Sequence, residues 1–228
     1  MDFFGDAWLA SRVLVLVPVV LSLSIHEFAH AWCAFRLGDD TAARQGRLTL
    51  NPLEHIDPVG LLLPLLGVPF GWAKPVPIDP SRMRGASLET GLVLSAAAGP
   101  LSNLLLAVGA TLALGAWSRL DPGAALAAGP IWQLLEWLVR VNLLLAVFNL
   151  IPVPPLDGSR IVDGLCPAWL RPGWEAFASV GPFALVALLL VPALLGASPM
   201  AGPVAGLQAF LDALYEAVAG CPPSPFLG

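Results

Sequence analysis

Four long apolar stretches dominate the hydrophobic pattern of the chain. They cover residues 13–35, 88–117, 131–151 and 177–195. An α-helix rises about 1.5 Å per residue, so about 20 apolar residues cross the roughly 30 Å hydrocarbon layer of a bilayer. The pattern therefore predicts four membrane-spanning helices, the last of them near the carboxyl end.

Two shorter segments lie between the first and second stretches. Residues 59–72 are apolar but number only 14 and include Pro64 and Pro69, which favours a re-entrant or interfacial segment over a full crossing. Residues 71–80 contain Pro75, Pro77 and Pro80. Because proline is excluded from helix interiors and tolerated at strand edges, this second segment is predicted to be extended.

The carboxyl end carries a different pattern. Across residues 205–218, polar Gln208, Asp212 and Glu216 recur every four residues opposite an apolar face. This spacing predicts an amphipathic helix, which could lie on the membrane interface.

Composition extends this picture to the whole chain, residues 1–228. It is 57% hydrophobic and 12% charged, with a mean hydropathy of +0.78, whereas soluble domains are about one-quarter charged. We therefore expect an all-α polytopic membrane protein that forms a single domain embedded in the lipid bilayer. The net charge is −5 and no basic run is present, so nucleic acid is not an expected partner.

The first apolar stretch contains the pattern His26-Glu27-x-x-His30. Residues four apart share one face of a helix, so both imidazoles can reach one zinc ion at about 2.0–2.1 Å, with the glutamate beside the remaining coordination position. Ionisable side chains inside a membrane helix are costly and usually functional. The motif therefore predicts a metal site.

A catalytic zinc ion typically has three protein ligands, and the residues leave two candidates for the third, His55 and Asp157. The number of membrane crossings between His30 and each candidate favours Asp157. If residues 59–72 form a re-entrant segment, they do not cross the membrane. The helices over 88–117 and 131–151 then cross it in opposite directions, which brings Asp157 to the same membrane face as His30. Prolines at 152, 154 and 155 should end the preceding helix and open a water-accessible pocket there.

Four segments together resemble the site-2 protease family of intramembrane metalloproteases, in its compact bacterial form without PDZ or CBS domains. They are the histidine motif and residues 46–52 (followed by His55), 98–103 and 149–158, within a region of similarity covering about residues 10–165. The resemblance implies a three-helix catalytic core and additional carboxyl-terminal helices. It also implies that His26, His30 and Asp157 bind one Zn²⁺, that Glu27 is the catalytic base, and that Asn149 holds substrate or the developing oxyanion.

Other candidate residues remain open at this point. His55 is interpreted as supporting the site or gating substrate, as a structural loop residue, or as a ligand. Asn103 is expected to contact substrate or to make an interhelical hydrogen bond. Lys74 and Val76 lie in the extended segment, which could bind an unwound substrate by strand addition.

The expected activity is hydrolysis of transmembrane protein or peptide substrates near the cytoplasmic face of a bacterial cell membrane. Eight cationic residues fall on the site-bearing side, which the positive-inside rule makes cytoplasmic: Arg36, Arg44, Arg47, Lys74, Arg82, Arg84, Arg160 and Arg171. Arg12 and Arg119 lie on the opposite side. A zinc transporter and a non-catalytic zinc-binding scaffold are the alternatives, and the sequence does not determine the oligomeric state.

Overall fold

The computed structural model describes residues 6–60, 72–123, 127, 129–194 and 200–223, and this part of the chain is helical without a β-strand. Its elements are α1 (Asp6–Arg36), α2 (Thr41–Arg44), α3 (Pro52–His55), the short 3-10 helix η1 (Pro80–Arg82), α5 (Leu88–Leu120), α7 (Pro130–Asn149), α8 (Asp157–Leu165), α9 (Arg171–Ser179), α10 (Gly181–Leu194) and α11 (Ala201–Ala219). The prediction of an all-α protein is confirmed.

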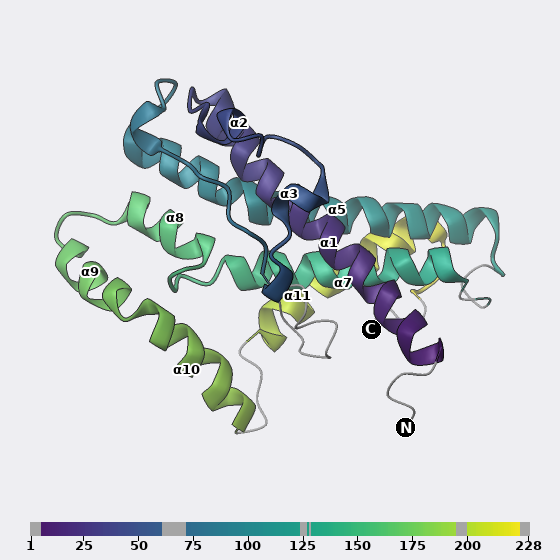
Figure 1. Ribbon diagram of the computed structural model, residues 1–228. Coiled ribbons are helices and arrows are strands. Elements are labelled where there is room, and N and C mark those ends of the chain that lie inside the picture. Colours follow the sequence, from purple (N-terminus) through teal and green to yellow (C-terminus); the bar gives the residue numbers. More distant parts are fainter. Residues whose placement is uncertain (1–5, 61–71, 124–126, 128, 195–199, 224–228) are drawn as a thin grey trace.

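A bundle of α1, α5 and α7 forms the centre of the molecule. In Figure 1, α5 and α7 run side by side and α1 crosses them diagonally. Local signals begin two of these helices: the Ser87 side chain accepts a hydrogen bond from the Thr90 backbone, and Pro130 occupies the first turn of α7. Three segments of the bundle are long and apolar enough to cross a membrane: Leu14–Arg36, Leu88–Leu120 and Pro130–Asn149. They correspond to three of the four predicted spans.

The predicted fourth spanning helix over residues 177–195 stays a prediction, because its last residue lies outside the described part of the chain. The chain forms two helices there, and α9 ends at Ser179 before α10 begins at Gly181. The break lies at Val180, and Pro182 falls in the first turn of α10, where a proline is tolerated. Within the described residues, helix α10 has 14 residues, which is about 21 Å of helix. It stands away from the bundle in Figure 1.

The predicted amphipathic helix exists as α11, but its apolar face meets protein. Leu211 and Tyr215 are buried in a cluster with Leu114 and Trp132, so α11 packs against α5 and α7. The Tyr215 hydroxyl also lies 2.5 Å from Ser118 Oγ of α5. An amphipathic pattern indicates that one face of a helix is shielded from water. In α11, residues of the helix bundle shield part of that face.

The segment between η1 and residue 72 is extended, as predicted. Ala73 makes an isolated antiparallel bridge with Ile56, and the Lys74 backbone N–H donates to the His55 carbonyl at 2.8 Å. The expectation of a re-entrant segment over 59–72 lies largely outside the described residues. Two buried side chains fasten the extended segment: Arg47 donates to the Lys74 carbonyl at 2.6 Å, and Asp39 accepts from the Asp79 backbone at 2.7 Å.

Candidate metal centre

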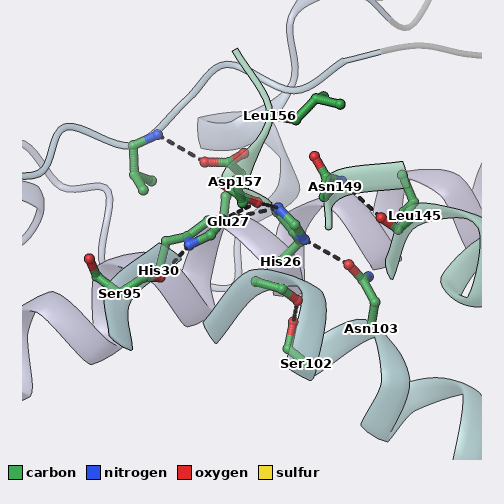
Figure 2. Close-up of polar contacts among 12 residues, drawn as sticks. His26, Glu27, His30, Ser95, Ser102, Asn103, Leu145, Asn149, Leu156 and Asp157 are labelled. Atoms are coloured by element: carbon green, nitrogen blue, oxygen red, sulfur yellow. Dashed lines mark hydrogen bonds and ion pairs between the residues drawn. The ribbon is translucent and has the colours of Figure 1, made fainter. Parts of the chain in front are cut away.

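Three metal-binding side chains converge where α1 meets the start of α8. His26 Nε2 and His30 Nε2 lie 3.0 Å apart, and Asp157 Oδ2 lies 3.1 Å from the first and 3.2 Å from the second. All three residues are buried, and Figure 2 shows their polar atoms facing one another. Of the described residues, these three form the group that could hold a metal ion.

Helix α1 supplies both histidines from successive turns of one face. Their rings are nearly perpendicular, at 86°, with centroids 4.6 Å apart. The second nitrogen of each ring is also held: His30 Nδ1 lies 2.7 Å from the Ser95 carbonyl and His26 Nδ1 lies 2.6 Å from Asn103 Oδ1. Because a carbonyl only accepts, His30 Nδ1 carries the proton and its Nε2 lone pair is directed to the group.

Asp157 reaches the histidines because α7 stops at Asn149 and the chain turns back before α8. The intervening Leu150–Leu156 segment includes the three prolines, which confirms the predicted helix end. Gly158 allows the tight turn, since a Cβ atom there would lie 2.3 Å from the Leu150 carbonyl oxygen.

Glu27 is held beside this group by the extended segment. Its Oε2 accepts a hydrogen bond of 2.9 Å from the backbone N–H of Val76, shown in Figure 2 as the dashed line to the extended chain. Val76 is itself buried. The backbone of residue 76 therefore orients the Glu27 carboxylate, while the exposed Lys74 side chain lies on the outer side of the segment.

Helix α5 approaches the histidines closely at Gly99. A Cβ atom at this position would lie 2.3 Å from His30 Nε2 and 2.6 Å from His26 Cε1. No real side chain tolerates such distances, so glycine is required by the space that the imidazoles occupy. In the sequence this glycine is one of a run of small residues typical of helix packing, which gives no sign of its place against the site.

The remaining predicted residues occupy different positions. Asn149 is half-buried at the end of α7, and its Nδ2 donates to the Leu145 carbonyl at 3.0 Å, leaving one further N–H. Asn103 makes an interhelical hydrogen bond with His26. His55 is buried away from the group, with its Nε2 2.8 Å from the Thr49 carbonyl, so the described structure does not bring it to the other two histidines as a ligand.

A cavity of about 440 Å³ opens beside the metal-binding group. It lies between the extended segment, α5, α8 and α9, and its lining includes Val76, Ser95, Pro154, Ser159 and Arg160. Pro154 belongs to the interrupted chain before Asp157, where a pocket was predicted. The cavity is large enough for one or two amino-acid side chains and mixes apolar and charged walls.

Several supporting groups were missed by sequence reasoning: the Ser95 carbonyl, Ser22, Asn142 and Asp39. For two of these side chains, the sequence contains a weak indication that they make buried hydrogen bonds. Ser22 and Asn142 lie in apolar helices, where polar residues require partners, but the partners are 120 positions apart. Only the packing of the helices identifies them.

The donor set fits zinc. Tetrahedral Zn²⁺ with ligands at about 2.0–2.1 Å places ligand atoms about 3.3 Å from each other, close to the 3.0–3.2 Å separations observed. Two imidazoles and one carboxylate leave a fourth position, and a glutamate lies next to the first histidine. These features, in a bundle of three membrane-length helices, define a multi-pass membrane metalloprotease.

Comparison with known proteins agrees with this class. The model of peptidase family M50 matches residues 115–192. The Bacillus subtilis protein "Putative zinc metalloprotease YwhC" is 39% identical over 194 residues, which cover 84% of this chain and 87% of that protein. "Putative zinc metalloprotease Rip2" of Mycobacterium tuberculosis H37Rv is 35% identical over 200 residues, covering 81% and 73% respectively. No solved structure gives a significant match. The chain belongs to peptidase family M50, the site-2 protease family of zinc metalloproteases.

Proposed function

We propose that this protein cleaves transmembrane protein substrates within or at the edge of the bilayer, close to its cytoplasmic face. The observation that carries the proposal is the meeting of His26, His30 and Asp157 beside Glu27 in a bundle of membrane-length helices. His26, His30 and Asp157 are assigned as the ligands of one zinc ion. When bound, zinc activates a water for attack and polarises the carbonyl of the scissile bond.

Glu27 is the proposed general base. Its Oε2 accepts the Val76 N–H, which leaves the second carboxylate oxygen to take a proton from the attacking water and later deliver it to the leaving amine. The backbone of the extended segment thus fixes the angle of the carboxylate. Asn149 is assigned to the substrate carbonyl, since one N–H of its amide is not used by the Leu145 carbonyl.

The extended segment is the proposed binding edge for substrate. A transmembrane helix hides its backbone groups in hydrogen bonds, so it must unwind before cleavage. An unwound strand could pair with residues 74–78, whose backbone is already extended and fastened by Arg47 and Asp39. The 440 Å³ cavity lies along this segment and would accept substrate side chains.

The test is cleavage of a membrane-anchored reporter by the purified protein in detergent or liposomes. Glu27→Gln keeps the side-chain volume and removes the base, so we expect cleavage to fall by about 10²–10⁴-fold while zinc content stays near one per chain. Asp157→Ala should reduce both cleavage and zinc content. Cleavage that survives Glu27→Gln would contradict the mechanism.

A further inference from the structure

A buried polar network continues from the metal centre into the helix bundle. His26 Nδ1 meets Asn103 of α5, Asn103 meets Asn142 of α7, and Asn142 meets Ser22 of α1. Asn103, Asn142 and Ser22 are completely buried. Because these side chains are completely buried, bulk water does not replace a lost partner, and each donor must face an acceptor.

The donor and acceptor of each hydrogen bond in this network can be assigned by starting from a backbone carbonyl, which can only accept. An amide side chain has one donor end and one acceptor end, and structures alone rarely distinguish them. One end of Asn142 lies 2.8 Å from the Leu138 carbonyl, which only accepts. That end must be the NH₂ group, and it also lies 2.8 Å from Ser22 Oγ. The oxygen of Asn142 therefore faces Asn103.

The same donor and acceptor assignment applies to Asn103 and then to His26. Asn103 places its NH₂ group 2.7 Å from the Asn142 oxygen and 3.4 Å from the Ser22 carbonyl, both acceptors. Its own oxygen therefore faces His26 Nδ1 at 2.6 Å, and that nitrogen must donate. The proton on Nδ1 leaves the lone pair on Nε2, which is the atom facing His30 and Asp157.

The two histidines differ in how this is achieved. His30 Nδ1 contacts the Ser95 backbone carbonyl directly, so its tautomer needs no further support. His26 Nδ1 contacts an amide whose orientation depends on its own acceptors, chiefly the Asn142 oxygen at 2.7 Å, with the Ser22 carbonyl more distant at 3.4 Å. A reversed amide would present N–H to Nδ1 and stabilise the tautomer whose Nε2 cannot bind a metal.

We propose that Asn142, supported by Ser22, is a positioning residue that sets the tautomer of His26 through Asn103 and so prepares Nε2 for metal binding. The inference rests on the proposed role of His26 as a ligand. It assigns a function to two polar residues that lie on the far side of Asn103 from the metal centre and touch neither metal nor substrate.

The first measurement is the tautomer of His26 in the zinc-free protein. The chain has three histidines, so nitrogen-15 NMR of histidine-labelled protein in detergent can resolve them, with His26→Gln and His30→Gln used for assignment. We expect His26 to be protonated on Nδ1 in the unaltered chain. Protonation on Nε2 would overturn the proposal without any variant at Asn142.

The second measurement removes the anchor. Asn142→Leu keeps the branched shape and the number of heavy atoms but has no polar ends, so His26 should become a mixture of tautomers and zinc affinity should fall by about 10-fold or more, as for other groups that orient metal ligands. Thr111→Val is the matched control. It removes a buried hydroxyl of α5 whose hydrogen bond goes to the Ala107 carbonyl of the same helix, and it should change neither quantity.

A rescue separates orientation from packing. Aspartate accepts at both oxygens when ionised, so Asn103→Asp in the Asn142→Leu protein should restore the Nδ1 proton of His26. Failure to restore it, or an Asn142→Leu protein equal to Thr111→Val in tautomer and affinity, would overturn the relay. Zinc affinity and NMR do not depend on cleavage, so loss of the proposed activity is detected separately.

Discussion

At the residue scale, a close contact at the metal centre involves a residue without a side chain. Gly99 of α5 faces both imidazoles, and the space for a Cβ atom is already filled by His30 Nε2 at 2.3 Å and His26 Cε1 at 2.6 Å. A methyl group must displace either the helix or the rings. Since metal ligands tolerate only small displacements, the site should be more sensitive to this position than the fold is.

We predict that Gly99→Ala lowers zinc affinity by at least about 10-fold, the scale seen when ligand orientation is disturbed, and lowers cleavage with it. The measurement is competition with a chromophoric chelator. Gly109→Ala is the control, because it lies in the same helix with nothing within 4 Å of the added atom and should be neutral or slightly stabilising. Equal effects of both substitutions would show that the contact at Gly99 does not constrain the site.

The chemistry-bearing residues differ in how far the sequence predicted them. The HExxH spacing places His26 and His30 on one face of a helix through local geometry alone, and the structure has them there. Asn142 could not be recognised in this way. Its partners lie on other helices, and a lone asparagine in an apolar stretch is compatible with many arrangements.

At the scale of elements, the extended segment depends on one buried carboxylate. Asp39 follows α1 and accepts hydrogen bonds from the backbones of Thr41 at 3.0 Å and Asp79 at 2.7 Å. It thereby joins the end of α1 to the far end of the segment that orients Glu27. Its neighbour Asp40 is only partly exposed and makes ion pairs with Arg44 and Arg82 at 2.7 and 2.8 Å.

We predict that Asp39→Ala loosens the segment, because it leaves two partly buried N–H groups without their acceptor, at a cost of up to about 1–3 kcal/mol. Limited proteolysis within residues 72–80 should become faster, and kcat/KM should fall as the Val76 contact with Glu27 is disturbed. Asp40→Ala removes ion pairs close to solvent, which contribute little, and should behave as the unaltered protein. An Asp39→Ala protein with normal proteolysis and activity would contradict this role.

Helices were predicted with uneven success for physical reasons. Long apolar runs identify α1, α5 and α7 because crossing a bilayer requires about 20 such residues. The run over 177–195 is also apolar, but the helix is interrupted at Val180, between α9 and α10. The amphipathic pattern indicated a helix where α11 lies, but the side chains buried in the bundle are Leu211 and Tyr215, whereas the apolar Phe210 is 59% exposed.

At the scale of the whole molecule, the metal centre links two elements that are distant in sequence. His26 and His30 come from α1, whereas Asp157 begins α8, 131 positions after His26. A ligand that binds only the folded chain stabilises it by RT ln(1 + [L]/Kd), about 2.7 kcal/mol at one hundred times Kd. Zinc should therefore contribute to the fold as well as to catalysis.

We predict that a chelator lowers the thermal unfolding midpoint in detergent and abolishes cleavage, and that added Zn²⁺ restores both. Asp157→Ala should lose most of this dependence, since the remaining histidines belong to a single helix. Differential scanning fluorimetry with and without chelator is the measurement. A midpoint that does not respond to chelation in the unaltered protein would show that the metal does not hold α8 to α1.

Orientation in the membrane gives a further prediction at this scale. Single cysteines are placed at Leu53 in α3, on the site-bearing side, and at Leu120, the last residue of α5, in a chain whose three natural cysteines are replaced by serine. Both positions are well exposed, at 76% and 86%. An impermeant maleimide should label Leu120→Cys on intact cells and Leu53→Cys only after permeabilisation. The reverse pattern would place the site on the outer face.

The sequence by itself determined the features that depend on neighbours along the chain. Apolar length marks the three bundle helices, four-residue spacing places the histidines together, and prolines after Asn149 end α7. Tertiary structure decided which distant groups meet: Asp157 with the histidines, Gly99 against their rings, and Asn142 with Asn103 and Ser22. The reason is that local geometry follows from backbone periodicity, whereas these contacts depend on the angles and register at which three helices pack, and similar apolar surfaces permit several of each.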